Sequence, residues 1–111
     1  MIEWMRVAEL RGEVGPDAFE EVVDLFLEEV DGVIGRLGSA PDATTLADDL
    51  HFLKGSALNL GFQAVAALCK ENEILLTSQG FAAVDTAALI ACYEASKQAF
   101  TEKLGSAAFA A

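Results

Sequence analysis

The helical spacing of apolar residues limits the folds open to this chain more than any other feature. Between residues 16 and 37, apolar side chains recur three or four positions apart, which places them on one face of an amphipathic helix. These side chains are Phe19, Val22, Val23, Phe26, Val30, Val33, Ile34 and Leu37. Acidic residues occupy the other faces, and no useful length of the chain has the alternating pattern of a strand. The sequence therefore predicts an all-α fold.

Five helices are predicted from patterns of this kind. Their ranges are 3–13, 16–37, 43–60, 62–78 and 86–104, with Gly105 as a stop before a frayed tail. Short loops between long amphipathic helices favour antiparallel neighbours. We therefore expect an up-and-down antiparallel four-helix bundle, with the short first helix as a cap over one end. A chain of 111 residues is the size of one domain, so residues 1–111 are assigned to a single domain.

Turn-forming and capping residues indicate where the helices begin and end. Gly61 and Gly80 are expected to close the third and fourth helices, because glycine readily adopts the conformation that ends a helix. Asp42 or Thr44 is a candidate N-cap of the third helix, and Asp85 is the candidate for the fifth.

The charge of the chain excludes several classes of partner. The formal net charge is -11 and the isoelectric point is about 4.2, so we expect repulsion from nucleic acids and from anionic membrane surfaces. No apolar run is long enough to span a membrane, and the N-terminal residues lack the pattern of a signal peptide. A cytoplasmic location and a basic or mixed-charge protein partner are expected. Cys69 and Cys92 are interpreted as buried reduced thiols, with a disulfide as the alternative.

His51 is the only histidine, and it lies on the side of the third helix that faces away from the apolar stripe. The stripe consists of Leu46, Leu50, Leu53, Ala57 and Leu60. An imidazole that faces solvent contributes little to a core but is a good nucleophile. A surface histidine without a role is the alternative interpretation.

Polar and small neighbours give the helix face around His51 its chemistry. Lys54, one turn away, could neutralise an anion on the imidazole. Gly55 costs a helix about 1 kcal/mol relative to alanine, which indicates either close packing or access for another molecule. Asp48 could orient the ring. Ser56 lies at the edge of the stripe and could bond to a carbonyl of the preceding turn or to a neighbouring helix.

Three further residues flank the histidine face. Phe52 and Asn59 lie on one side of His51, and Leu58 lies on the other. Phe52 and Leu58 could contact the fourth helix or could form the rim of a docking surface, and the sequence favours neither interpretation over the other.

The segment HFLKGSALNLG, residues 51–61, resembles the H-x-L-K-G-S-[SA]-x-x-[LI]-G signature of histidine-containing phosphotransfer (HPt) domains. The resemblance extends to an acidic, apolar helix before the motif and to the pair Leu68-Cys69 after it. Ala57 stands where many members of the family have a second serine, which removes one hydroxyl near the site.

The resemblance implies a phosphorelay intermediate rather than an enzyme with kinase or nucleotide-binding activity. In such a protein, Nε2 of His51 accepts a phosphoryl group from a receiver-domain aspartate or a histidine kinase and passes it to the aspartate of a response-regulator receiver. Lys54 would balance charge. Gly55 would give the receiver access, and Phe52, Leu58 and neighbours on the second helix would form an apolar docking surface. The remaining predicted docking residues are Asp48, Ser56 and Asn59.

The resemblance also implies partners and cofactors. The receiver brings the Mg²⁺, so this chain needs no metal ligands of its own and no cofactor. The expected partners are response-regulator receiver domains or a hybrid histidine kinase, and the chain is expected to be a monomer.

Three other functions are compatible with parts of this sequence. A helical docking module whose histidine is never phosphorylated predicts the same surface. The phosphoacceptor domain of a sensor kinase is disfavoured, because Phe52 and Leu53 follow His51 where such domains have an acidic residue. A metal-dependent or hydrolytic enzyme is disfavoured because a single histidine without paired acidic ligands makes a poor zinc site.

Overall fold

The computed structural model describes residues 1–39 and 42–104 of the chain. These residues form five α-helices and one short 3₁₀ helix, and they contain no strand. The helices are α1 (Trp4–Val14), α2 (Pro16–Ser39), α3 (Leu46–Leu60), α4 (Gln63–Gln79), the 3₁₀ helix η1 (Phe81–Ala83) and α5 (Thr86–Leu104). The prediction of an all-α fold is confirmed. The predicted stop at Gly105 and the tail after it lie outside the described residues.

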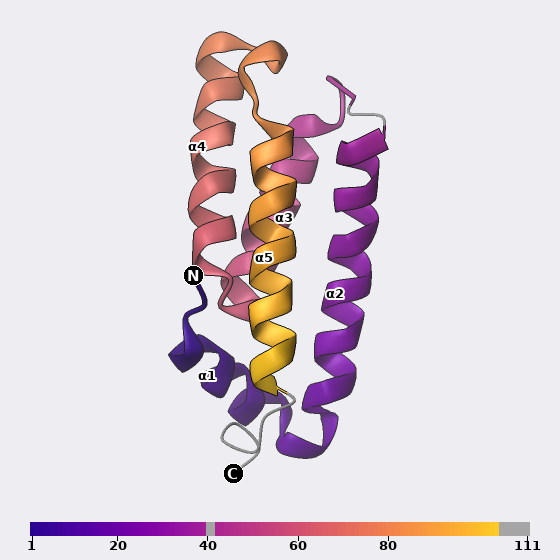
Figure 1. Ribbon diagram of the computed structural model, residues 1–111, viewed down its shortest axis with the longest axis vertical. Helices are drawn as coiled ribbons and strands as arrows, with labels where there is room; N and C mark the ends of the chain where they lie inside the picture. The colour runs from indigo at the N-terminus through magenta and orange to yellow at the C-terminus, as the bar shows by residue number, and fades with distance from the viewer. Residues whose placement is uncertain (40–41, 105–111) are drawn as a thin grey trace.

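Helices α2 to α5 lie side by side along the long axis of the molecule, and α1 lies across their lower end (Figure 1). Helix α2 contacts α3 and α5, and helix α4 contacts the same two helices. Helix α3 therefore lies diagonally across from α5, behind it in Figure 1. Helix α1 contacts α2 and α3.

Glycine ends the helices where the sequence predicts. Gly61 closes α3 with φ 78°, and Gly80 closes α4 with φ 91° and donates its N–H to the Leu76 carbonyl. Gly15, with φ 88°, separates α1 from the proline that opens α2. The Asp85 carboxylate accepts the Ala88 N–H at 2.9 Å, which confirms the predicted N-cap of α5.

The start of α3 differs from the prediction. Residues 43–45 form a turn, and the helix begins at Leu46 with Thr45 as its N-cap, whose side chain makes no capping hydrogen bond. The Asp42 carboxylate instead accepts hydrogen bonds from the N–H and the hydroxyl of Thr44, each at 2.8 Å. These hydrogen bonds close the turn and lower the pKa of Asp42, so neither Asp42 nor Thr44 caps the helix itself.

The core is aromatic where α1 meets the other helices. Phe62 packs against Phe100 and Tyr93 with ring centroids 5.1 and 6.1 Å apart, and all three side chains are buried. Trp4 of α1 stacks on Phe100 at 5.7 Å, and the Lys103 ammonium lies 4.9 Å from the centre of the indole. These contacts attach α1 to the end of α5.

Polar contacts join α2 to α5 on the other side of the core. Tyr93 donates its hydroxyl to Asp31 at 2.6 Å, and the Lys97 ammonium lies 2.8 Å from the same carboxylate. Partial burial raises the pKa of Asp31, but the two hydrogen bonds and the charge of Lys97 outweigh it and lower the pKa overall. A Cβ on Gly38 would lie 3.6 Å from Ile90 of α5, in ordinary contact, so α2 and α5 approach closely at this point.

Candidate functional site

His51 lies on the exposed side of α3, opposite the buried stripe that the sequence predicts. Leu46, Leu50, Leu53, Ala57 and Leu60 are all buried. In the part of the chain that the structure describes, no hydrogen bond or ion pair reaches the imidazole. Both ring nitrogens are therefore open to a second molecule, as a nucleophile requires.

Lys54 reaches from α3 to α4. Its ammonium lies 3.1 Å from Oε1 and 3.2 Å from Oε2 of Glu73, and both side chains are 28% exposed. The ion pair holds the lysine on the edge of α3 that faces α4, one helical turn after His51. Sequence reasoning missed Glu73 as a site residue. One signal in the sequence could have identified it. Helices α3 and α4 are joined by a tight turn, so an acidic residue on α4 can pair with a lysine on α3.

Gly55 lies one turn after His51 on the same exposed face. Apart from the backbone of its own helix, a Cβ at this position would meet none of the described residues within 4 Å. Close packing between helices therefore does not explain the glycine, and access for another molecule becomes the stronger interpretation.

Apolar side chains lie exposed around His51. Phe52 is 37% exposed and Leu58 is 57% exposed, so both are available to a partner. Asn59 is exposed as well, and its carbonyl oxygen accepts a hydrogen bond from Arg6 of α1. Together with His51 and Gly55, these residues form what we call the histidine face.

Two predicted site residues behave differently from the others. Asp48 is exposed, but no hydrogen bond joins it to His51 among the described residues, so an orienting role has no support in the geometry. Ser56 is only 6% exposed. It is not available for direct contact with a partner, which corrects its predicted place among the docking residues. The reason is its position on α3, on the side turned toward the core with Asp49 and Leu60.

Helix α2 borders the histidine face. Arg36 of α2 donates to the buried carboxylate of Asp49 at 2.9 Å, so the side of α2 that carries Arg36 lies toward α3. Leu25 and Glu29 share that side, eleven and seven residues before Arg36. Leu25 is 55% exposed and helps line a shallow hollow of about 220 Å³. Sequence reasoning did not single out Leu25, because it lies off the apolar stripe of α2.

The two cysteines do not form an alternative reactive centre. Both are free thiols; Cys69 is buried and Cys92 is half-buried, so the prediction of reduced thiols is confirmed and that of burial is met fully only at Cys69. Burial, with the charge of nearby Glu73, raises the pKa of Cys69 to about 12. Cys69 therefore stays protonated and is a weak nucleophile near neutral pH.

Comparison with known protein families identifies the family of this chain. The sequence model of the Hpt domain family matches residues 21–102. The chain belongs to the Hpt domain family. The match contains α3 with His51, α4 with Glu73 and most of α2 and α5, whereas α1 precedes it. No curated protein and no solved structure matches the chain significantly.

Membership of the Hpt domain family assigns the chain to phosphotransfer in two-component signalling. Hpt domains carry phosphoryl groups between receiver and kinase domains and are not kinases themselves. Among the described residues, no helix is long and apolar enough to cross a membrane. The same residues contain no group of three or more His, Cys, Asp or Glu side chains placed to hold a metal ion.

Proposed function

We propose that this Hpt domain is a phosphorelay intermediate that carries the phosphoryl group on Nε2 of His51. The observation that supports it most directly is the placement of the only histidine on an open face, with no intramolecular partner among the described residues. A nucleophile that must meet the active site of another protein has to be exposed in this way.

The transfer step follows from the chemistry of the imidazole. The electron pair on Nε2 attacks phosphorus of the aspartyl phosphate in line, a P–N bond forms, and the P–O bond to the aspartate breaks. The aspartate leaves as a carboxylate, and the ring keeps its Nδ1 proton or releases it to water. The reverse step returns the phosphoryl group to the aspartate of a response-regulator receiver. Positioning and charge control such a reaction, because the phosphoryl group is only loosely bonded at the transition state.

Charge on the histidine face is set by the pair Lys54 and Glu73. Lys54 follows His51 by three residues on the same helix, so its ammonium can reach and attract phosphoryl oxygens on the imidazole. The carboxylate of Glu73 holds the lysine but also cancels part of its charge. We propose that the lysine turns toward the phosphoryl group when it arrives, and that the receiver supplies the Mg²⁺. This chain then needs no cofactor of its own.

The docking surface for the receiver is assigned to the histidine face together with the adjoining side of α2. Phe52 and Leu58 supply exposed apolar area from α3, and Leu25 supplies it from α2. Gly55 lets the loops of the receiver approach His51, because a side chain there would project into open space where the receiver must lie. Asp48 and Asn59 lie at the polar rim.

The arrangement that presents this surface is proposed to be an up-and-down antiparallel four-helix bundle of α2 to α5, with α1 as a cap over one end. The contacts of α2 and α4 with both α3 and α5 support it, as does the position of α1 in Figure 1. We propose that the chain acts as a monomer, because a net charge of -11 opposes self-association.

Phosphoryl transfer from a labelled receiver tests the proposal. Receivers charged with labelled acetyl phosphate are mixed with the full chain, and the label is followed by gel electrophoresis. We expect label on the wild type and none on His51→Gln, which should keep its fold because the position is exposed. Binding of a receiver with no transfer of label would instead favour a docking module whose histidine is not phosphorylated.

A further inference from the structure

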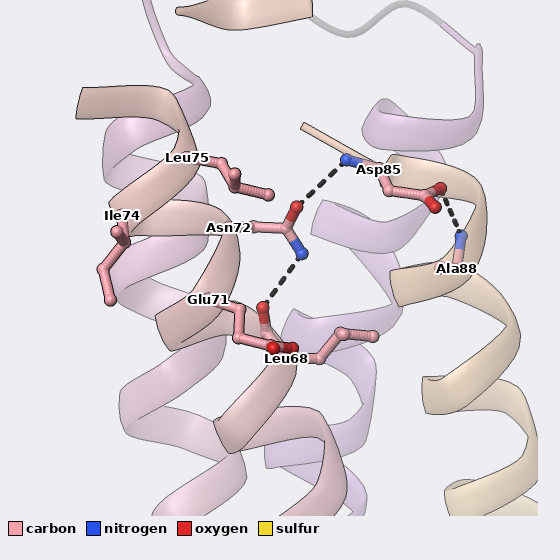
Figure 2. Close-up of a pocket in the computed structure, with 7 residues that line it drawn as sticks. All are labelled: Leu68, Glu71, Asn72, Ile74, Leu75, Asp85 and Ala88. Atoms are coloured by element: carbon pink, nitrogen blue, oxygen red, sulfur yellow. Dashed lines mark hydrogen bonds between the residues drawn. The ribbon is translucent and has the colours of Figure 1, made fainter. Parts of the chain in front are cut away.

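A second surface feature lies away from the histidine face, between α4 and α5. It is a groove of about 330 Å³, shown in Figure 2 and called here the α4–α5 groove. The residues that line it are Leu68, Glu71, Asn72, Ile74, Leu75, Asp85 and Ala88. None of them takes part in the proposed phosphotransfer.

Aliphatic side chains form the walls of the α4–α5 groove. Leu68 and Leu75 point from α4 toward α5 in Figure 2, and both are half-buried. Leu75 is not among the side chains packed against the core, whereas the side chain of Ile74, 59% exposed, points away from α5 in Figure 2. Apolar surface is therefore left open to solvent along this side of α4.

Some polar groups of the groove are used in hydrogen bonds within the protein, and the carboxylates add negative charge. Asn72 uses both ends of its amide: it donates to the Leu68 carbonyl at 2.9 Å and accepts the Asp85 N–H at 3.0 Å. One oxygen of Asp85 accepts the Ala88 N–H, and both Asp85 and Glu71 are exposed, so their negative charge is accessible to a partner. Among the residues that the structure describes, no cationic side chain lines the groove. A complementary occupant must combine an aliphatic side chain with positive charge.

The position of the groove allows it to act independently of His51. Helix α5 lies diagonally across from α3, and α4 separates the two along one side. The groove lies on the α5 side of α4, whereas Glu73, which pairs with Lys54, lies on the α3 side. A molecule in the groove and a receiver on the histidine face would therefore not compete for the same surface.

We propose that the α4–α5 groove docks a cationic amphipathic segment of a partner protein. An aliphatic side chain of the segment packs between Leu68 and Leu75, and a flanking lysine or arginine faces Glu71 and Asp85. A second copy of this chain is a poor occupant, because symmetric contact would place these carboxylates against each other in a chain of net charge -11.

The probe for this proposal is a synthetic amphipathic peptide of leucine and lysine, about four helical turns long. It is titrated into the ¹⁵N-labelled full chain at about physiological ionic strength, which screens nonspecific attraction. We expect chemical-shift changes at residues of the groove and a dissociation constant that is about tenfold weaker in Leu75→Ser. Glu71→Gln should weaken binding about threefold.

Matched controls separate the groove from general attraction to an acidic protein. Glu94→Gln removes an exposed charge from α5 outside the groove, and Leu58→Ser removes an exposed leucine from α3. Neither should change peptide binding, and thermal melts should show all four variants folded. Equal weakening by Glu71→Gln and Glu94→Gln would overturn the proposal. So would no effect of a folded Leu75→Ser, shifts on the histidine face, no binding at all, or concentration-dependent shifts at the groove without peptide.

Discussion

At the scale of single residues, the site depends on a few side chains with distinct tasks. His51 is open, Lys54 is held by Glu73, and Gly55 leaves space above the helix. These three features require different tests. The test at His51 concerns a covalent bond to phosphorus, the test at Lys54 concerns charge, and the test at Gly55 concerns side-chain volume.

Substitution at Gly55 separates access from stability. Gly55→Ala should stabilise the fold by a few tenths of a kcal/mol up to about 1 kcal/mol, since alanine is the better helix former and its Cβ lies more than 4 Å from every described residue beyond its own helix backbone. Gly55→Gln should leave the melting temperature almost unchanged while it slows phosphoryl transfer from a receiver strongly. Thermal melts and transfer rates measured on the same protein decide this. A Gln variant that transfers at the wild-type rate would show that the glycine does not serve access.

Removal of the lysine charge tests the electrostatic role of Lys54. Lys54→Met should lower the rate of phosphoryl transfer roughly fivefold, the rate equivalent of about 1 kcal/mol, because it removes a cation and leaves the Glu73 carboxylate unpaired near the site. Adding Glu73→Gln to this variant should restore part of the loss. Lys70→Met, which removes an exposed lysine from α4, is the matched control and should transfer normally. A double variant slower than Lys54→Met would contradict the electrostatic account.

At the scale of helices, the turn between α3 and α4 fixes how α1 joins the bundle. Gly61 has φ 78°, and its carbonyl accepts the Glu3 N–H at 2.6 Å. A Cβ on Gly61 would lie 2.6 Å from the Glu3 carbonyl oxygen and 3.1 Å from Val7. The glycine is therefore required both by backbone conformation and by the close approach of α1.

Gly61→Ala should be strongly destabilising. We expect a loss of about 1–3 kcal/mol from the positive φ alone, and more from the contact with α1. Urea denaturation measures the loss, and hydrogen exchange at α1 should increase more than at α5. Gly12→Ala on the open side of α1 is the control and should not destabilise. A Gly61→Ala protein as stable as the wild type would show that α1 does not pack on this turn.

Local signals predicted the helices well and the contacts between them poorly. The range of α5 is the one predicted, and Gly61, Gly80 and Asp85 act at helix ends as expected, because glycine and capping residues operate within a few residues of the chain. The start of α3 was misplaced because the side chain of Asp42 closes a turn before the helix begins.

The candidate site was predictable only where it depends on α3 alone. The exposed position of His51 and the burial of its opposite stripe follow from helical periodicity. Glu73 and Arg36 reach α3 from other helices, and their pairing depends on the register between helices, which periodicity within one helix does not determine. Periodicity placed Ser56 at the edge of the buried stripe, and the structure buries it there.

At the scale of the whole molecule, the protein is an elongated body of 46 × 22 × 20 Å. Its long sides present the histidine face on α3 with the adjoining side of α2, and the α4–α5 groove on the other side. The described part of the chain also buries two titratable side chains, the thiol of Cys69 and the phenol of Tyr93.

Stability should fall in alkali because of these two buried groups. The pKa of Cys69 rises from an ordinary 9.0 to about 12, chiefly through burial, and burial also raises the pKa of Tyr93. The unfolded chain therefore releases its protons first as the pH rises, and the free energy of unfolding decreases above about pH 9. Urea denaturation at a series of pH values, in high salt to screen the net charge, measures this. The free energy of unfolding of Cys69→Ala should decrease less steeply with pH. An identical pH dependence in both proteins would show that Cys69 does not contribute to the loss of stability.

The central claim is that the phosphoryl group resides on a nitrogen of His51. Its most direct test is to phosphorylate the chain with a charged receiver, locate the phosphate by mass spectrometry under alkaline conditions, and then treat the product with acid. The account predicts one phosphate on His51, stable in alkali and lost in acid as a phosphoramidate should be, and none on His51→Gln. Phosphate on another residue, or a linkage that survives acid, would contradict it.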